Sequence, residues 1–557
     1  MIQTQTKLED QLIKIHREAE EKEAQRKAEK AGLSYLNLTT APVQVDALKL
    51  VGEEEARRLL AAPFQLKDKN LALAAADPAN AKIQTLVKKL TEQGLNVKLF
   101  AASAGSLNHV WSFYKYLPPP SEEITGKVSI EEKRLTELFQ KLINLEKVKK
   151  EILSFDFKKS PTGQILEVVL AGALNNRASD IHFEAEEKGT RLRYRIDGAL
   201  HDVLTNLPND IYKSIVSRTK LLSNLKLNVQ DAPQDGRFTI RLDNKDIELR
   251  VSTIPSEFGE TIVMRVLDPA AIRITLPQLG LRQDDLEIIK NQLNQPNGMA
   301  LNTGPTGSGK TTTLYAFLLS KLSTEIKIIT IEDPIEYHIE GLEQTQVDAE
   351  AGYDFAGGLR SIMRQDPDVI LVGEVRDKET ADIAIQAALT GHLVFSTVHA
   401  NSASGAIPRL LDLGVKAASI GPALNLIIAQ RLVRKLCEHC KVVEKPAPEL
   451  QNKIKKFLTS LPKRVDRKDY ENVQLFKPKG CAKCVGLGYK GRIAIFELLE
   501  VDDEMEALIS PEVGESVILK QAFKKGMVTM QQDGVLKTIS GITTFDEVEE
   551  VTGPLKW

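Results

Sequence analysis

The residues whose spacing most clearly indicates chemistry form a glycine-rich stretch, GPTGSGKTTT, in the middle of the 557-residue chain. Gly304, Gly309, Lys310 and Thr311 fit the pattern G-x-x-x-x-G-K-[ST]. Apolar GMALNT precedes the stretch and helix-forming TTTLYAFLLSKL follows it, which argues against a glycine-rich turn without function. In a loop between a strand and a helix, inward-turned backbone N–H groups hold phosphate oxygens.

Each residue type in this stretch has a physical role in holding a nucleotide. Lys310 is expected to reach the β- and γ-phosphates, and the Thr311 hydroxyl to bind Mg²⁺. The predicted site consists of Gly304, Pro305, Thr306, Gly307, Ser308, Gly309, Lys310, Thr311 and Thr312.

Three further apolar segments end in polar residues. KIITIEDPIE carries Glu332, DVILVGE ends in Glu374, and HLVFSTVHA ends near His399. Because the carboxyl ends of strands line the ligand crevice of an open α/β sheet, we expect all three to converge on the loop around Lys310.

Hydrolysis needs one carboxylate for the attacking water and another for Mg²⁺, held directly or through water. Glu332 and Glu374 are the candidates, and the sequence does not say which is the base. Gly373 stands where an Asp usually precedes the acidic residue, which weakens direct metal coordination by Glu374. His399 is either a phosphate sensor or a structural histidine.

All four cysteines of the chain lie in two C-x-x-C pairs, Cys437 with Cys440 and Cys481 with Cys484. Two such pairs are what one tetrahedral Zn²⁺ needs. Disulfides are disfavoured in a cytosolic chain, and free thiols or redox chemistry would not require this pairing. The 40 residues between the pairs are expected to contain a helix at 448–461.

Arginines alternate along one predicted strand. In TRLRYRID, the period of two puts Arg191, Arg193 and Arg195 on one face. This face is either a solvated sheet surface or is aimed at an anion held by another domain or subunit. Further arginines in the same region favour the second interpretation: Arg237, Arg241, Arg250 and Arg265.

The pattern of elements predicts an α/β multidomain protein. Residues 43–51 and 70–77 are expected to be strands, and 130–155 one charged helix. The predicted regions are a charged, solvated helical extension (1–31), a small α/β domain (32–116), a linker and helix (117–159), an arginine-bearing domain (160–268), an ATPase core with a mostly parallel sheet (269–430), a tetracysteine zinc element (431–495) and a helical C-terminal region (496–557).

The charge balance, Lys+Arg 74 against Asp+Glu 76, gives a formal net charge of -2. No global basic field indicates nucleic acid, so no direct nucleic-acid partner is expected. The N-terminal residues are too charged for a secretory signal, and no apolar run is long enough to span a bilayer. We expect a cytoplasmic protein that partners recruit to the membrane.

Together these motifs resemble the secretion ATPase superfamily, most closely the assembly ATPases of type IV pili (the PilB type) and the ATPases of type II secretion (the GspE type). The resemblance covers residues from about 160 to the C-terminus. Besides the cysteine pairs, it is carried by SDIHFE, RYRIDG, PQDGRF, RVSTIP, GPTGSGKTTTLY, TIEDPIEY, MRQDPDVILVGEVRDKETADIAIQAALTGHLVFSTVHAN, GYKGRIAIFELL and GMVTMQQDGVLKTISGITTFDEVEEVT.

The resemblance implies a RecA-like P-loop domain preceded by a PAS-like domain, in a ring hexamer. It places Glu332 in an acidic box, Glu374 in the Walker B region, and His392 and His399 in a histidine box. Arginines of the PAS-like domain would approach nucleotide bound at a cleft or by a neighbouring subunit. Arg237, Arg250 and Arg265 match the family motifs, with Arg193 and Arg195 as further candidates.

The resemblance also implies ATP, Mg²⁺ and Zn²⁺ as ligands and a motor that drives pilin polymerisation through an inner-membrane platform protein and other pilus or secretion components. Retraction ATPases typically lack the N-terminal extension and the cysteines, so the assembly or secretion branch is favoured. Type II secretion or a competence pseudopilus, a nucleic-acid transport ATPase and a nucleotide-switched scaffold are the alternatives. No R-L-G-x-x-L repeat is found, so cyclic di-GMP is not an expected ligand.

Overall fold

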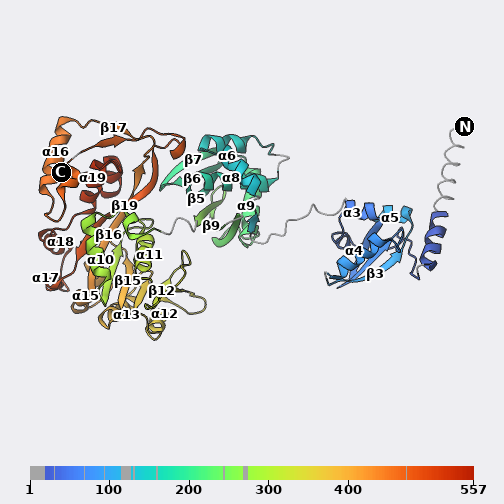
Figure 1. The fold of residues 1–557 in the computed structure, drawn as a ribbon, viewed down its shortest axis with the longest axis horizontal. Helices are drawn as coiled ribbons and strands as arrows, with labels where there is room; N and C mark the ends of the chain where they lie inside the picture. The colour runs from blue at the N-terminus through green and yellow to red at the C-terminus, as the bar shows by residue number, and fades with distance from the viewer. Residues whose placement is uncertain are drawn as a thin grey trace. The chain divides into compact units, whose positions relative to one another are not determined.

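A computed structural model describes residues 19–557, apart from 31, 68, 93, 115–126, 130–131, 158–160, 243–244, 268–273 and 472. The chain divides into two compact units, 1–124 and 125–557 (Figure 1).

The first unit is a three-stranded sheet with helices. Strand β2 pairs antiparallel with β1 and parallel with β3. Its elements are α2 (Val45–Leu48), α3 (Glu53–Leu59), β1 (Ala61–Lys67), β2 (Asn70–Ala75), α4 (Ala81–Glu92), β3 (Asn96–Ala101) and α5 (Ala104–Trp111).

Two predictions for this unit are wrong. The strand expected at 43–51 is replaced by helix α2, since the neighbouring Ala47 and Leu48 are both fully buried, whereas a half-buried strand would turn one of them outward. The N-terminal extension is helical at residues 19–30 but not wholly solvated. Its Ala24 and Ala28 are buried, and Glu21 accepts a hydrogen bond from Ser103 at 2.8 Å. The part of the predicted helical extension that precedes residue 19 lies outside the residues that the structure describes.

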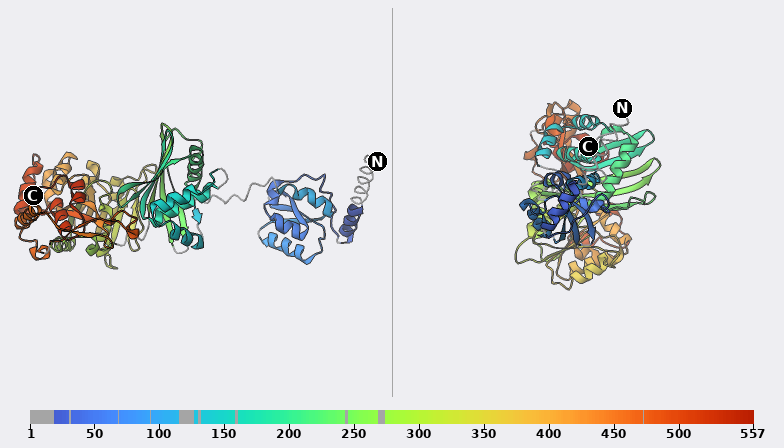
Figure 2. Two further views of the ribbon diagram at one scale, coloured as in Figure 1. Left: turned by 90° about the horizontal axis from the view of Figure 1, so that it is seen from above. Right: turned by 90° about the vertical axis from the view of Figure 1, so that its right-hand side faces the viewer.

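The second unit contains two seven-stranded sheets. In the first, the strand order is β4-β8-β9-β10-β5-β6-β7, and the helices lie on one face (Figure 2). Its elements are β4 (Lys127–Ser129), α6 (Glu132–Lys141), α7 (Leu145–Leu153), α8 (Thr162–Asn175), β5 (Ala178–Glu186), β6 (Gly189–Ile196), β7 (Ala199–Leu207), α9 (Asn209–Leu222), β8 (Gln234–Leu242), β9 (Lys245–Ser256) and β10 (Gly259–Leu267).

The single helix expected at 130–155 is two helices, α6 and α7. The Asn144 side chain accepts a hydrogen bond from the Lys147 N–H at 2.9 Å and caps the start of α7. An asparagine at this position competes with the helical backbone, so it starts a new helix rather than continuing the previous one. The break lets α6 and α7 both contribute to the core against α8.

The second sheet has the order β13-β12-β14-β15-β11-β16-β19, and all its pairs are parallel except β16 with β19. Its first half contains η3 (Leu276–Leu279), α10 (Gln283–Leu293), β11 (Gly298–Thr303), α11 (Lys310–Lys321), β12 (Ile328–Glu332), β13 (Glu343–Gln346), α12 (Phe355–Ile362), β14 (Val369–Val372), α13 (Lys378–Leu389), β15 (Leu393–Val398), α14 (Ala403–Asp412) and α15 (Ala417–Ala423).

The chain then completes the sheet and closes it with helices. The remaining elements are β16 (Leu424–Leu436), β17 (Val442–Glu444), α16 (Pro448–Ser460), η4 (Arg467–Tyr470), β18 (Leu475–Lys477), η5 (Ala482–Cys484), β19 (Tyr489–Glu500), α17 (Asp503–Glu506), α18 (Glu515–Lys524), α19 (Met530–Ile539) and α20 (Phe545–Thr552). The helix expected between the cysteine pairs is α16. The boundaries proposed at 431 and 495 fall inside β16 and β19, so the segment between these strands is an insertion in the sheet.

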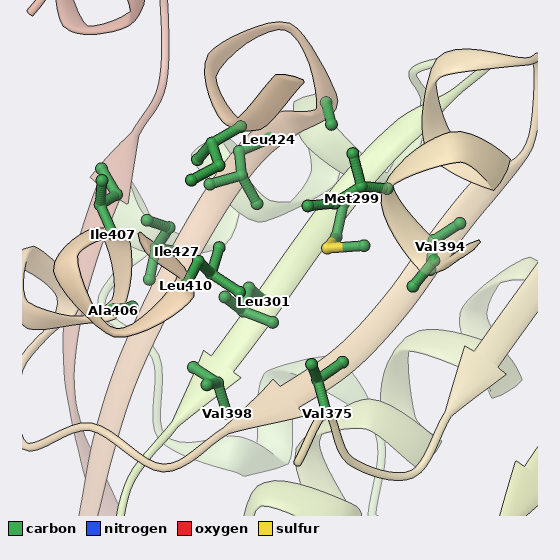
Figure 3. Packing of buried hydrophobic residues seen from close by; sticks show 14 of the residues in the cluster. Met299, Leu301, Val375, Val394, Val398, Ala406, Ile407, Leu410, Leu424 and Ile427 are labelled. Carbon is green, nitrogen blue, oxygen red and sulfur yellow. The ribbon is translucent and has the colours of Figure 1, made fainter. Parts of the chain in front are cut away.

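Strand β11 shows why this sheet is buried on both faces. All six of its residues are buried. Met299 and Leu301 pack with Val398 and Ile427 on one face (Figure 3), whereas Ala300 belongs to the cluster on the other. A strand in a parallel sheet that helices cover on both sides has a nearly continuous apolar sequence, and the sequence of β11, GMALNT, fits this pattern.

None of the helices in the described ranges combines the length and the apolar character that crossing a membrane requires.

Candidate nucleotide and metal sites

The loop between β11 and α11 depends on glycine at two positions. At Gly304, φ is 150°, and an added Cβ would lie 2.7 Å from the Gln430 carbonyl oxygen and 2.6 Å from Ser308 Oγ. Gly309 has φ 90° at the N-cap of α11. The Ser308 hydroxyl is buried and has no hydrogen-bond partner within the described residues. A spare donor at a helix N-terminus is suited to an anionic acceptor such as a phosphate oxygen.

Strand β16 braces this loop through Gln430, a residue that the motif search missed. Its side chain is fully buried, donates to the Ser308 carbonyl at 2.7 Å and accepts from Asn302 Nδ2 at 2.8 Å. The signal in the sequence was a glutamine inside the apolar run LNLIIAQRLV, because a buried polar side chain needs a partner.

Lys310 begins α11, and its Nζ donates to the Gly304 carbonyl at 2.7 Å and the Pro305 carbonyl at 3.3 Å. Burial lowers the pKa of Lys310, while Glu374 opposes the shift and Arg431 adds to it. The lysine therefore lies in the field of Glu374. Thr311, the next residue, is exposed.

Glu374 follows β14 and lies among charged partners. Its carboxylate is paired with Arg376, and its Oε2 lies 3.4 Å from His399 Nε2. Arg376 also approaches Asp333 at 3.9 Å. The residues after β12, β14 and β15 thus meet at one edge of the sheet, as their positions after parallel strands predicted.

Glu332, the last residue of β12, has a different environment. Its side chain is buried, and its Oε1 accepts hydrogen bonds from Thr330 Oγ1 at 2.7 Å and Gln344 Nε2 at 3.2 Å. Its Oε2 accepts one from the Tyr315 hydroxyl. The motifs identified Glu332 but none of these donors.

The structure separates the two histidines of the predicted histidine box. His392 precedes β15 and its Nδ1 lies 3.0 Å from the Ala387 carbonyl oxygen, whereas His399 follows the strand. At about 3.3 Å per residue, seven residues of extended chain separate them by roughly 20 Å. Only His399 reaches the edge that carries Lys310.

Most arginines of the first sheet have acidic partners. Arg195 lies 3.6 Å from Asp180, Arg193 pairs with Glu184, and Arg191 lies 3.4 Å from Asp202. These pairs are within the sheet, which supports the solvated-surface interpretation for this strand.

The other candidate arginines line a cavity of about 1370 Å³ together with segment 334–340. Arg250 donates to Glu336 at 3.0 Å and to the Ile335 carbonyl at 2.7 Å, and Arg265 donates to Asp180 at 2.9 Å. Arg237 is 77% exposed and lies 3.7 Å from Glu248. Among the described residues that line the cavity, none belongs to loop 304–311, so the structure does not bring these arginines to Lys310.

The four cysteines form one cluster, with all sulfur atoms within 4.8 Å of one another. The Sγ distances are 3.9 Å for Cys437 to Cys481 and 3.7 Å for Cys440 to Cys484. A tetrahedral ion with metal–sulfur bonds of about 2.3 Å requires sulfurs ~3.8 Å apart. Burial raises the pKa of the Cys437 and Cys440 thiols. Burial also opposes ionisation of Cys484, but hydrogen bonds with the backbone N–H groups of Cys481 and Gly488 and with neighbouring thiols lower the pKa of this thiol to about 7. The cluster could hold a metal ion.

Comparison with protein families identifies the second unit. Residues 157–550 match the model "Type II/IV secretion system protein". The chain belongs to this family. It is therefore a secretion ATPase, and residues 31–112 separately match the MshEN domain. The prediction that cyclic di-GMP is not a ligand stays a prediction.

This secretion ATPase has curated relatives in both branches. It is 36% identical over 525 residues to a type IV pilus assembly ATPase PilB of Myxococcus xanthus, covering 94% of the chain and 89% of the relative. It is 42% identical over 393 residues to a type II secretion system protein E of Pseudomonas aeruginosa, covering 71% and 76%. The Legionella pneumophila ATPase DotB shares its fold, with TM-score 0.50, 21% identity and coverage of 70% and 95%.

The brace on the loop leads to a first prediction. Replacing Gln430 by Ala removes the donor to a buried carbonyl, a loss of about 1–3 kcal/mol. We expect this secretion ATPase to bind ATP about tenfold more weakly as Gln430→Ala, measured with a fluorescent ATP analogue. Gln451→Ala, on the exposed face of α16, is the matched control and should bind normally. Equal affinities in both variants would contradict the brace.

Proposed function

We propose that this secretion ATPase hydrolyses ATP to drive type IV pilus assembly. The observation that supports hydrolysis is the meeting of Lys310, Glu374 and Glu332 at one edge of a parallel sheet. The observation that supports pilus assembly is the similarity to the Myxococcus assembly ATPase along 94% of the chain. Type II secretion is the second candidate, favoured by higher identity over a shorter part.

In this proposal the loop from Gly304 to Thr312 binds the phosphates, with Lys310 on the β- and γ-phosphates and the Thr311 hydroxyl on Mg²⁺. The ion would neutralise charge that develops on the phosphate oxygens. Glu332 and Glu374 supply the carboxylates for the attacking water and for the ion or its water. His399, beside Glu374, would respond to the γ-phosphate.

The arginines act from another position. Arg237 is 77% exposed and lies 3.7 Å from Glu248, whereas Arg250 and Arg265 form closer pairs with Glu336 at 3.0 Å and Asp180 at 2.9 Å. We place Arg237 against nucleotide bound by a neighbouring subunit of a homohexamer, where it neutralises charge in the transition state. Arg250 and Arg265 would reach that site after leaving their present partners.

The cysteine cluster is proposed to hold structural Zn²⁺. Its sulfur spacing matches a tetrahedral ion, and each pair comes from a turn that holds two sulfurs. An all-thiolate site leaves no open position for a substrate, so the ion would serve stability rather than hydrolysis.

The setting of the motor is also a proposal. The near-neutral net charge of -2 gives no field for nucleic acid. We propose a cytoplasmic ring at the inner face of the membrane that acts on a membrane platform protein and other pilus components.

The first test is the loss of the phosphate-binding lysine. Because Lys310 is the cation nearest the phosphates in this proposal, Lys310→Ala should lower phosphate release by about 100-fold or more. Glu374→Gln should also lower it. Lys321→Ala, at the other end of α11, should keep normal turnover. Unchanged turnover in Lys310→Ala would sink the proposed activity.

The second test separates transition-state stabilisation from binding. Arg237→Ala should lower turnover on the order of 10³-fold while ATP affinity changes little, since the arginine acts on charge that develops during transfer. Arg241→Ala removes an exposed arginine of the same strand and should leave both quantities normal. Equal losses of turnover and affinity in Arg237→Ala would count against this role.

The third test concerns the metal. Elemental analysis of the purified full chain should find a single zinc ion per chain. Cys440→Ser and Cys484→Ser should lose zinc and unfold at lower temperature, because the ion links segments 40 residues apart in sequence. His439→Ala, between the first two cysteines, should retain zinc. A full zinc content in Cys484→Ser would exclude the four-cysteine site.

A further inference from the structure

The buried carboxylate of Glu332 is held by neutral groups only. Glu332 is the last residue of β12, at the edge of the sheet, and is 3% exposed. The donors come from three elements: Tyr315 on α11, Thr330 on β12 and Gln344 on β13. Among the described residues, no Lys, Arg or His forms an ion pair with it. Its orientation therefore depends on these hydrogen bonds.

Tyr315 connects this carboxylate to the phosphate-binding loop. The tyrosine lies on α11, five residues after Lys310, and its side chain is fully buried. Burial, followed by the charge of Glu332 and the hydrogen bond to it, raises the pKa of Tyr315 far above its ordinary value. The hydroxyl therefore stays protonated and donates a hydrogen bond to Glu332 Oε2.

The distribution of donors leaves one oxygen available. A carboxylate offers about four lone-pair positions, two on each oxygen. Thr330 and Gln344 both donate to Oε1, whereas Tyr315 alone donates to Oε2. By this count Oε2 can accept one more hydrogen bond, from the attacking water or from a water on Mg²⁺. Tyr315 acts on the same oxygen that would contact this water.

We propose that Tyr315 is a positioning residue for hydrolysis, because its hydroxyl fixes the Glu332 carboxylate relative to the helix that holds the phosphates. The inference rests on the proposed ATPase function. It assigns Tyr315 no contact with nucleotide. A rotation of α11 when phosphate binds would move Tyr315 and with it the Glu332 oxygen that accepts from water.

The experiment measures steady-state ATP hydrolysis and ATP affinity of the full-length Tyr315→Phe variant. Turnover should fall about tenfold, as expected for loss of a hydrogen bond to a charged group. ATP affinity should stay within about twofold, because the tyrosine is assigned no contact with nucleotide. Tyr194→Phe is the matched control: its hydroxyl is also buried and donates to the Val169 carbonyl at 2.6 Å, in the other sheet domain. Its turnover and ATP affinity should both be unchanged.

A Glu332→Gln variant separates the proposed role of the carboxylate from the proposed role of Tyr315. If Glu332→Gln hydrolyses ATP normally, the proposed role of Glu332 is wrong. If it is inactive but Tyr315→Phe has a normal turnover, only the positioning role is overturned. In the Glu332→Gln background, Tyr315→Phe should cause no further loss, since the tyrosine acts through the carboxylate. An additional tenfold loss in this double variant would mean that the tyrosine acts independently of Glu332, and would assign it a structural role.

Discussion

The parallel alignment of β11, β12, β14 and β15 is the constraint on which the nucleotide site depends. Parallel strands end at the same edge of a sheet, so the loop after β11 and the polar residues after the other three meet although up to 95 residues separate Gly304 from His399. Helices on both faces cover these strands, and every residue of the four is buried. A one-residue slip of β12 would turn Glu332 to the opposite face of the sheet.

The two carboxylates at this edge have opposite surroundings. Glu374 lies among Arg376, His399 and the field of Lys310, whereas Glu332 is buried among hydroxyl and amide donors. Charged partners respond to salt and to any anion that enters, while neutral donors hold their geometry. Environments that differ in this way are how proteins give two carboxylates distinct tasks.

The sequence was most informative where chemistry depends on neighbouring residues. The phosphate loop, the strand ends, the cysteine pairs and α16 could all be predicted because each has a local pattern. The strand expected at 43–51 failed since burial of Ala47 and Leu48 overrides local preference, and Asn144 split a predicted helix. Gln430 and Tyr315 were missed because their partners lie on other elements. The carboxylate that pairs with each arginine of the first sheet likewise depends on which strands are neighbours. The alternating pattern within one strand does not specify those neighbours.

Strand β16 joins two parts of the molecule that the motifs treat as separate. At Gln430 it supports the phosphate loop, and seven residues later the chain reaches Cys437 of the cysteine cluster. The backbone N–H of Cys437 donates to the Gly488 carbonyl, just before β19. The pairing of β16 with β11 ends at Ala429, and from Gln430 to Leu436 the strand pairs with β19. The cysteine insertion is therefore anchored on the same continuous strand that supports the nucleotide loop.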